Sequence, residues 1–390
     1  MIKDKKNILL IAISSYTSGD AQSTRVDDIA ISVRDEFDVM VITSFADGRR
    51  AAQDFPRVIV IKNYYLAFLS PRVKKLFKSA RLVVVETGLP YAFCSFFYKS
   101  RFIWILYGPD KGIRFSGSYI VKNKLNLFLE RDFLLSSAKL LITPAEWVSN
   151  FYRRKGMNVI SIPAAINCNI FYPNKVKRID RNNVRLIIVG SWDGFNGRKR
   201  QHELLNIFPA IVKSFPNIHL TAAGLDNSSI RILAQMVDSL NLSNNVELIG
   251  RLNPTEVAEA MTAADIYVSN TISDAFYRII VEAFSCGLPA IARDASKLIP
   301  DFHLAPKHHV INSGAGALYD GTSKSFLRAL NEVLANYEEL KENALRYASR
   351  FSRELVLNEY RDIILSLAQN VTSVSSHNYD KGVGNLDEER

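Results

Sequence analysis

The sequence predicts an α/β protein built from two domains, each with a parallel β-sheet covered by helices. Its 390 residues exceed the usual length of one domain. Short runs rich in Ile, Val and Leu alternate with helical patterns, which is typical of strands buried on both faces of a parallel sheet. A polar stretch at residues 173–183 lacks apolar periodicity and separates two such alternations. We therefore expect two α/β units joined by a linker, with their sheets facing a central cleft.

The first domain is expected to cover residues 1–172. Its strands are predicted at residues 7–13, 38–43, 57–61, 82–86, 102–107, 140–143 and 159–162, and its helices at 24–35, 123–137 and 145–155. The turn after the first strand contains Gly19, which could let the backbone approach a phosphate, although a plain turn fits equally well. The turn lacks the G-x-G-x-x-G pattern, which disfavours a nicotinamide-dependent dehydrogenase.

The second domain is expected to cover residues 184–351. Its strands are predicted at residues 184–190, 219–223, 246–249 and 266–269, with a further small strand after Pro289. Its helices are predicted at 202–215, 228–240, 254–263, 277–286 and 324–335, and a long helix at 337–367 follows them. The polar residues 371–390 are expected to form a disordered tail.

Positive charge is concentrated in the first half of the chain. The net charge is +10, and residues 1–175 contain 26 Lys and Arg against 14 Asp and Glu. Residues 71–81 place their apolar side chains on one helical face and their basic ones elsewhere, and a second basic cluster contains Lys111, Arg114, Lys122 and Lys124. The first segment fits an amphipathic helix on an anionic membrane, and it also fits a surface helix with its apolar side in the core.

Several other classes of protein are disfavoured. The chain has no apolar run of membrane-spanning length, and its first apolar run indicates a buried strand rather than a signal peptide. Three scattered cysteines provide neither a disulfide framework nor metal-ligand spacing, so a cytosolic location is expected. Because zinc spacings and aromatic RNA-binding signatures are lacking, no nucleic-acid partner is expected.

The most informative segment runs from Ser273 to Ala292. It places two carboxylates, Asp274 and Glu282, eight positions apart across a loop and the predicted helix at 277–286. Gly287 stops that helix, and Pro289 follows it. The N–H groups that open the helix can meet an anion, and the carboxylates can bind hydroxyl groups. The spacing alone also fits a capped surface helix with both acids merely solvated.

This segment resembles the signature of the retaining glycosyltransferases of family 4. In that pattern two Glu residues are separated by seven others and lead into Ala, a small residue, Cys-Gly, a variable residue and Pro. Here Glu282 takes the second acidic position and residues 283–289 follow it, while the shorter Asp274 stands at the first position and must differ in its reach to the donor sugar. Further likenesses, in the same order as in the family, occur at residues 162–173, 248–257, 264–269 and 351–354. The resemblance implies the GT-B fold of two Rossmann-like domains, with a C-terminal helix at 352–370 that completes the first domain.

The resemblance also implies roles for individual residues. Glu282 would accept hydrogen bonds from the ribose, and Asp274 would face the donor sugar. The backbone of Phe276, Tyr277 and Arg278 would meet the pyrophosphate, and Arg251 would lie beside the base.

The sequence departs from the family pattern after the strand that ends in Gly190. Ser191 stands where Arg is usual, and Lys199 best matches the family Lys, with Arg198 replacing the missing Arg on the phosphate. A solvated helix start fits these basic residues as well. In the first domain, Tyr107 occupies the turn where relatives carry a catalytic His, and it is assigned to holding a hydroxyl.

The implied function is transfer of a sugar from a nucleoside-diphosphate donor to an acceptor hydroxyl with retained configuration, with no metal or other cofactor expected. A lipid-linked or lipopolysaccharide glycan is the expected acceptor, in bacterial cell-surface polysaccharide synthesis, with the protein cytoplasmic or peripheral on the inner face of the membrane. Two alternatives stay open at this point. One is a catalytically silent nucleotide-sugar-binding subunit, and the other is a phosphorylase or epimerase with the same fold.

Overall fold

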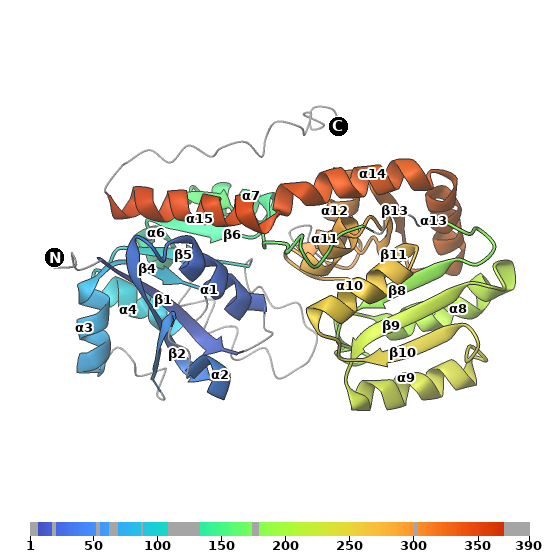
Figure 1. Ribbon diagram of the computed structural model, residues 1–390, viewed down its shortest axis with the longest axis horizontal. Helices are drawn as coiled ribbons and strands as arrows, with labels where there is room; N and C mark the ends of the chain where they lie inside the picture. Colours follow the sequence, from blue (N-terminus) through green and yellow to red (C-terminus); the bar gives the residue numbers. More distant parts are fainter. Residues whose placement is uncertain are drawn as a thin grey trace. The chain divides into compact units, whose positions relative to one another are not determined.

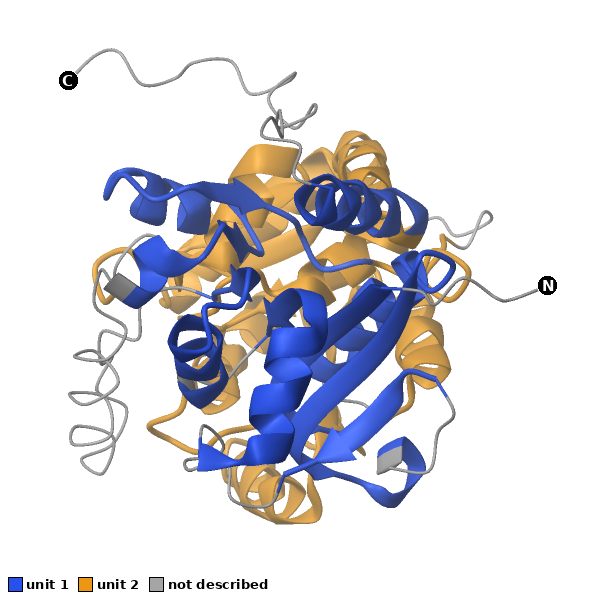
Figure 2. Ribbon diagram, turned by 90° about the vertical axis from the view of Figure 1, so that its left-hand side faces the viewer, with its two compact units in different colours: residues 1–112, 118–165, 354–390 blue, residues 113–117, 166–353 orange. Residues whose placement is uncertain are grey.

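The computed structural model describes residues 7–17, 21–51, 55–61, 69–86, 89–107, 133–173, 179–299 and 303–369. These residues form two compact units (Figures 1 and 2). Unit 1 contains the described residues up to 165 together with residues 354–369, and unit 2 contains residues 166–353 with the gaps given above. The predicted tail at 371–390 and the basic cluster around Lys111 lie outside the described residues.

Unit 1 is built on a parallel sheet that has seven strands within the described residues, in the order β3-β2-β1-β4-β5-β6-β7. The strands are β1 (Asn7–Tyr16), β2 (Phe37–Ala46), β3 (Arg57–Val60), β4 (Ala80–Val85), β5 (Phe102–Ile105), β6 (Leu140–Thr143) and β7 (Val159–Ser161). The helices are α1 (Ala21–Ser32), α2 (Gly48–Ala51), α3 (Pro71–Ser79), α4 (Leu89–Phe97), α6 (Phe133–Ser137), α7 (Glu146–Arg153) and the C-terminal α15 (Arg353–Ala368).

Helix α15 belongs to the core of unit 1 although it comes last in the chain. Val356, Tyr360, Ile363 and Ile364 pack in one apolar cluster with side chains of β1, β2 and β4. Arg81 and Arg101 also donate hydrogen bonds to the last carbonyls of α15, at 2.8 Å from the oxygens of Ala368 and Leu367. Complete burial of an aliphatic or aromatic side chain stabilises a fold by about 1.5–3 kcal/mol, so this helix contributes several such increments to unit 1.

Unit 2 repeats the architecture with a parallel sheet that has six strands within its described residues, in the order β10-β9-β8-β11-β12-β13. The strands are β8 (Arg185–Val189), β9 (His219–Leu225), β10 (Val246–Gly250), β11 (Ile266–Ser269), β12 (Ala290–Arg293) and β13 (Gly316–Tyr319). The helices are α8 (Gln201–Ser214), α9 (Asn227–Ser239), α10 (Pro254–Ala263), α11 (Arg278–Ser285), α12 (Ala305–Ser313), α13 (Ser323–Ala335) and α14 (Tyr337–Ala348). Two Rossmann-like domains are therefore present, as predicted.

Local sequence explains where several of these helices begin and end. Asn253 caps α10 by accepting hydrogen bonds from the N–H groups of Thr255 and Glu256, and the Glu256 side chain accepts a hydrogen bond from the Asn253 N–H. This is a capping box. Gly287 has a φ of +78°, a left-handed conformation that ends α11 at the position predicted from the sequence.

The prediction of one helix at residues 337–367 is wrong. Helix α14 ends at Ala348, a 3-10 turn covers Ser349–Phe351, and α15 starts at Arg353. The backbone at the break bonds to Ile166, whose N–H donates to the Phe351 carbonyl at 2.8 Å and whose carbonyl accepts from the Arg353 N–H at 3.0 Å. These bonds to a distant segment replace those that would have continued the helix.

The basic helix α3 uses its apolar side inside unit 1. Val73 and Phe77 are completely buried, while Lys74, Lys75 and Lys78 are exposed. The surface-helix alternative therefore accounts for its apolar face, and only its basic face is accessible. Among the described residues, no helix has the length and apolar character needed to cross a membrane.

Candidate active site

The candidate site of unit 2 lies where its strand order reverses, between β8 and β11. In open parallel sheets, ligands bind beyond the carboxyl ends of the strands at this switch point. Residues 190–200 follow β8, and residues 270–277 follow β11. The sheet therefore brings together two loops that are about 75 residues apart in the sequence, including Arg198 and Asp274.

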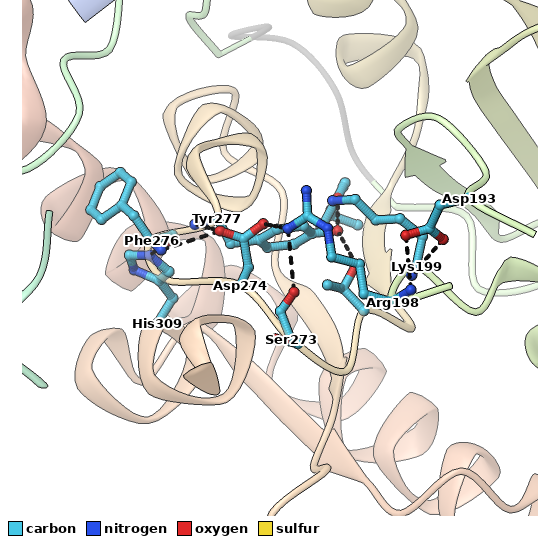
Figure 3. Close-up of polar contacts among 10 residues, drawn as sticks. Asp193, Arg198, Lys199, Ser273, Asp274, Phe276, Tyr277 and His309 are labelled. Carbon is cyan, nitrogen blue, oxygen red and sulfur yellow. Dashed lines mark hydrogen bonds and ion pairs between the residues drawn. The ribbon is translucent and has the colours of Figure 1, made fainter. Parts of the chain in front are cut away.

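The loop after β8 is held by a carboxylate that the sequence did not reveal. The side chain of Asp193 accepts hydrogen bonds from the backbone N–H groups of Arg198, at 2.8 Å, and of Lys199, at 3.1 Å (Figure 3). A side chain at Gly197 would put its Cβ 2.0 Å from Asp193 Oδ1, so the loop needs glycine there. These contacts fix the backbone from which both cations extend.

Asp274 joins the two loops. Its Oδ2 accepts a hydrogen bond from Arg198 Nη1 at 2.6 Å, and its Oδ1 accepts from the N–H groups of Tyr277 at 3.0 Å and Phe276 at 3.3 Å. Burial alone would raise the pKa of Asp274, but the charges of Lys199 and Arg198 and these N–H bonds hold it below its usual value. Asp274 is therefore an ionised carboxylate in contact with a cation.

Two of the N–H groups assigned to the pyrophosphate are thus already engaged. Phe276 and Tyr277 donate to their own neighbour Asp274. The N–H groups of Arg278 and Ile279 open α11, where a helix provides no acceptor for them. An anion at this end of α11 would meet those two groups and the side chain of Arg198, which is 46% exposed.

Glu282 lies on the second turn of α11 and is 6% exposed. Arg278, one turn earlier, forms an ion pair with it, with 3.0 Å between Nε and Oε1. Burial raises the pKa of Glu282, and the Arg278 guanidinium opposes that shift without cancelling it. The carboxylate therefore has a cationic partner on its own helix.

His309, which was not identified from the sequence, stabilises the turn at Phe276 and Tyr277 that leads into α11. Its Nε2 bonds to the carbonyl oxygen of Phe276, which can only accept, so Nε2 carries the proton. Its Nδ1 then accepts from the Tyr347 hydroxyl at 3.0 Å. Burial lowers the pKa of His309 to about 4, so the ring is neutral. A histidine in α12 thus fixes the carbonyl of a residue in the turn.

The remaining predicted residues lie in different places. Gly190 follows β8 next to the Lys199 side chain, and Ser191 is exposed just after it. Arg251 is exposed after β10, and no described contact joins it to the Asp274 cluster. Tyr107 lies in unit 1, where its hydroxyl donates to Glu86. Gly19 lies outside the described residues.

The described residues contain no group of three or more His, Cys, Asp or Glu side chains arranged to hold a metal ion. The expectation that no metal is needed stays a prediction. The charges at the site are instead Arg198 and Lys199 with Asp274, and Arg278 with Glu282. Chemically, this arrangement suits an anionic group that also carries hydroxyls.

Residues 176–351 match the family described as glycosyl transferases group 1. One component of the phosphatidylinositol N-acetylglucosaminyltransferase of Arabidopsis thaliana is 25% identical over 146 residues, which cover 37% of this chain and 32% of that protein. The phosphatidyl-myo-inositol mannosyltransferase of Mycobacterium tuberculosis is 27% identical over 144 residues, 36% of each chain. The matched part spans about a third of the length of these curated relatives.

Solved structures share the fold over nearly the whole chain. HepE of Anabaena, in complex with UDP and glucose, has a TM-score of 0.70 at 20% identity and covers 92% of this chain and 100% of its own. WaaG, a glycosyltransferase involved in lipopolysaccharide biosynthesis, has a TM-score of 0.67 at 17% identity and covers 91% of this chain and 99% of its own. The predicted fold and resemblance are confirmed. Residues 176–351 match the group 1 glycosyl transferases, and the chain as a whole has the GT-B fold.

Proposed function

We propose that this protein is a glycosyltransferase that moves a sugar from a nucleoside-diphosphate donor to an acceptor hydroxyl. The observation that carries the proposal is the cluster of Arg198, Lys199 and Asp274 at the switch point of the domain that matches the family. Two cations beside an ionised carboxylate match a diphosphate joined to a sugar. A protein of the same fold, HepE, has been crystallised with UDP and with UDP-glucose.

In this proposal, donor binding rearranges the Arg198–Asp274 pair. A guanidinium binds a phosphate in two-pronged fashion, so the diphosphate competes with Asp274 for Arg198. Release from Arg198 leaves the Asp274 carboxylate to accept hydrogen bonds from the sugar. Glu282 accepts hydrogen bonds from the ribose, each worth roughly 1.5–3 kcal/mol as a charge-assisted bond, while Arg278 remains its ion-pair partner.

Departure of the diphosphate is the demanding step. The bond between the anomeric carbon and the phosphate oxygen breaks, and negative charge grows on the diphosphate, where Lys199 and Arg198 stabilise it. The acceptor oxygen attacks from the same face and its proton passes to the departing phosphate, so the anomeric configuration is retained. The scheme needs neither a strong protein base nor a metal. Tyr107 is proposed to help place the acceptor in unit 1.

A lipid-linked or lipopolysaccharide glycan is the proposed acceptor, in bacterial polysaccharide synthesis at the inner face of the cell membrane. Two observations support it. The exposed lysines of α3 give unit 1 a basic surface, and the names of the curated relatives place their activity on phosphatidylinositol. Basic surface residues are attracted to anionic lipid headgroups.

A second candidate is a catalytically silent subunit that binds a nucleotide sugar. It is favoured by the engagement of Asp274 with Arg198 and of Tyr107 with Glu86, because both proposed catalytic side chains have intramolecular partners. This candidate binds the donor without turning it over.

The test is a thermal-shift panel of UDP-, GDP- and ADP-sugars, followed by a nucleoside-diphosphate release assay with lipid-linked acceptors. A ligand that binds only the native state raises its melting temperature, so at least one donor should give a shift. Release that needs both donor and acceptor supports the transferase. Binding without release supports the silent subunit, and the lack of any shift across the panel rejects both.

A further inference from the structure

Tyr277 has a backbone conformation that is unusual for its residue type. It occupies the N-cap of α11 with φ 58° and ψ 60°, and its side chain makes no capping bond. This left-handed region suits glycine, whereas a residue with a Cβ pays an energetic cost to occupy it. A large aromatic residue at this position therefore needs contacts that compensate for its backbone.

The tyrosine hydroxyl is held inside unit 2. The side chain is 3% exposed, and its oxygen lies 2.9 Å from the Tyr267 hydroxyl and 3.1 Å from Thr271 Oγ1. Tyr267 comes from β11, and Thr271 comes from the loop that follows it. These contacts fix the plane of the Tyr277 ring relative to the sheet.

The ammonium group of Lys199 lies over the face of the Tyr277 ring. Its Nζ lies 4.5 Å from the ring centroid, within the range of a cation–π interaction. The other end of the residue is fixed by Asp193, which accepts a hydrogen bond from the Lys199 N–H. The aliphatic part of the Lys199 side chain lies close to Gly190, which follows β8. A Cβ added to Gly190 would be 3.8 Å from Lys199 Cε.

We propose that the side chain of Tyr277 is a positioning residue for Lys199. Its ring places the ammonium group beside Asp274, on the turn whose following N–H groups open α11. The inference rests on the proposed function, because the purpose of the arrangement is to present Lys199 to the diphosphate. It goes further than that function by assigning a role to a side chain whose backbone alone was expected to act.

A pair of matched variants isolates the ring. Tyr277→Phe and Tyr277→Leu both lose the hydroxyl and both keep a Cβ in the left-handed conformation, but only Phe keeps an aromatic face. Affinity for UDP, GDP and ADP is measured by calorimetry, and turnover is measured with the donor that the panel identifies. We expect Tyr277→Leu to weaken diphosphate affinity or turnover about 5- to 20-fold, within the range of a cation–π contact. Tyr277→Phe should stay within about threefold of the wild type.

Two controls separate positioning from packing. In a Lys199→Ala background, Tyr277→Leu should cost nothing further, because its effect acts through the lysine. The contact between Lys199 and the Tyr277 ring can also be tested without any nucleotide. Lys199 is acetylated with acetic anhydride, and its labelling is measured by peptide mass spectrometry with the exposed Lys213 as internal reference. The relative labelling of Lys199 should rise several-fold in Tyr277→Leu and stay near the wild-type value in Tyr277→Phe.

Equal losses in the Phe and Leu variants, additive losses with Lys199→Ala, or unchanged labelling would each overturn the proposal. A wild-type chain that binds none of the three diphosphates, with the labelling difference intact, would reject the proposed function. It would also reject a catalytic purpose for the positioning of Lys199, although the contact between Lys199 and the Tyr277 ring would still be supported. The two failures therefore give different patterns.

Discussion

The two units have charged side chains at equivalent positions, but these side chains differ in how far they are exposed to solvent. In unit 2, Arg198 is 46% exposed beyond the switch-point strands, and its partner Asp274 is half-buried. In unit 1, Glu86 follows β4 at the corresponding switch point, and it is completely buried beside Tyr107, whose ring contacts Arg25. The guanidinium of Arg25 lies 5.0 Å from the centroid of the Tyr107 ring.

The difference indicates what each cluster does. A half-exposed ion pair can exchange a partner for a ligand, because water and ligand reach it. The buried cluster of Glu86, Tyr107 and Arg25 is a fixed part of the core, because removing one member leaves a charge uncompensated. The Arg25 cluster also includes Tyr360 of α15 in its electrostatic surroundings. Topology thus provides equivalent places in both units. Burial leaves the pair in unit 2 accessible to the proposed donor and makes the cluster in unit 1 part of the core beside the C-terminal helix.

Arg25→Met should give the largest effect, on stability alone. Removing the cation takes away its contact with the Tyr107 ring and its favourable electrostatic interaction with the buried Glu86, and leaving a buried charge uncompensated costs about 3–5 kcal/mol. The melting temperature should fall by several degrees, while donor affinity of the remaining folded protein stays unchanged, because the described contacts of Arg25 lie in unit 1. Arg34→Met, at an exposed position next to α1, is the matched control and should change the unfolding free energy by less than about 0.5 kcal/mol. Loss of donor affinity with normal stability would contradict the contrast between the units.

Lys199→Ala should lower activity and leave stability unchanged, which is the opposite of the effect expected for Arg25→Met. Loss of a group that stabilises charge only in the transition state typically costs about 10²–10³ in turnover. The melting temperature should hardly change, because the side chain is partly exposed. Steady-state kinetics with Lys213→Ala as control checks this, since Lys213 is an exposed cation on α8. A variant with normal turnover and lower stability would place Lys199 with the structural charges.

Glu282→Gln tests a carboxylate that combines features of both units, since it is buried like Glu86 but lies next to the proposed donor site. Loss of the charge-assisted bonds to ribose should reduce kcat/KM by about 10- to 1000-fold, mostly through weaker donor binding. Glu259→Gln, an exposed position on α10, is the control. Near-normal kinetics would reject the ribose role.

The sequence predicted both sheets and most element positions, while the roles of the predicted site residues stay predictions. The spacing of Asp274, Glu282, Gly287 and Pro289 is a local signal, since it depends on one loop and one helix. The partnership of Asp274 with Arg198 is not local, because it spans 76 residues and depends on β8 lying beside β11. No short motif encodes that adjacency, so Arg198 was assigned to a phosphate and its carboxylate partner was missed.

His309 was missed for a different reason. It lies in α12, whose sequence Ala-Pro-Lys-His-His-Val-Ile-Asn-Ser has no clear apolar repeat, so no helix was predicted there. Its burial and its bond to the Phe276 carbonyl come from tertiary packing alone. Asp193 likewise appears as an ordinary loop acid until its two bonds to the Arg198–Lys199 backbone are seen.

The pKa of His309 predicts a pH effect confined to unit 2. The folded-state pKa is lowered to about 4 by burial, whereas an unfolded His titrates near 6.5. The unfolded chain therefore binds more protons between these values, so stability present above pH 6.5 is lost as the pH falls toward 4. At pH 5 the loss amounts to about 2 kcal/mol. His309→Gln removes this titration, so the melting temperatures of the two proteins should converge as the pH falls from 7 to 5. Parallel curves would show that another group controls the acid limit.

Lys75→Gln should give the smallest effect, and it tests whether the basic face of unit 1 acts at a membrane. The side chain is exposed on α3, whose apolar side is already buried, so any membrane attraction is electrostatic. One lysine near an anionic surface contributes about 1 kcal/mol, so partitioning onto vesicles rich in anionic lipid should weaken about fivefold at low salt. The difference should vanish near 0.5 M salt, at about which concentration the screening length is only a few ångströms. Lys213→Gln in unit 2 should have no effect, because its charge lies outside the basic half of the chain. Equal, salt-insensitive partitioning of all three proteins would confine the role of unit 1 to the fold and the acceptor.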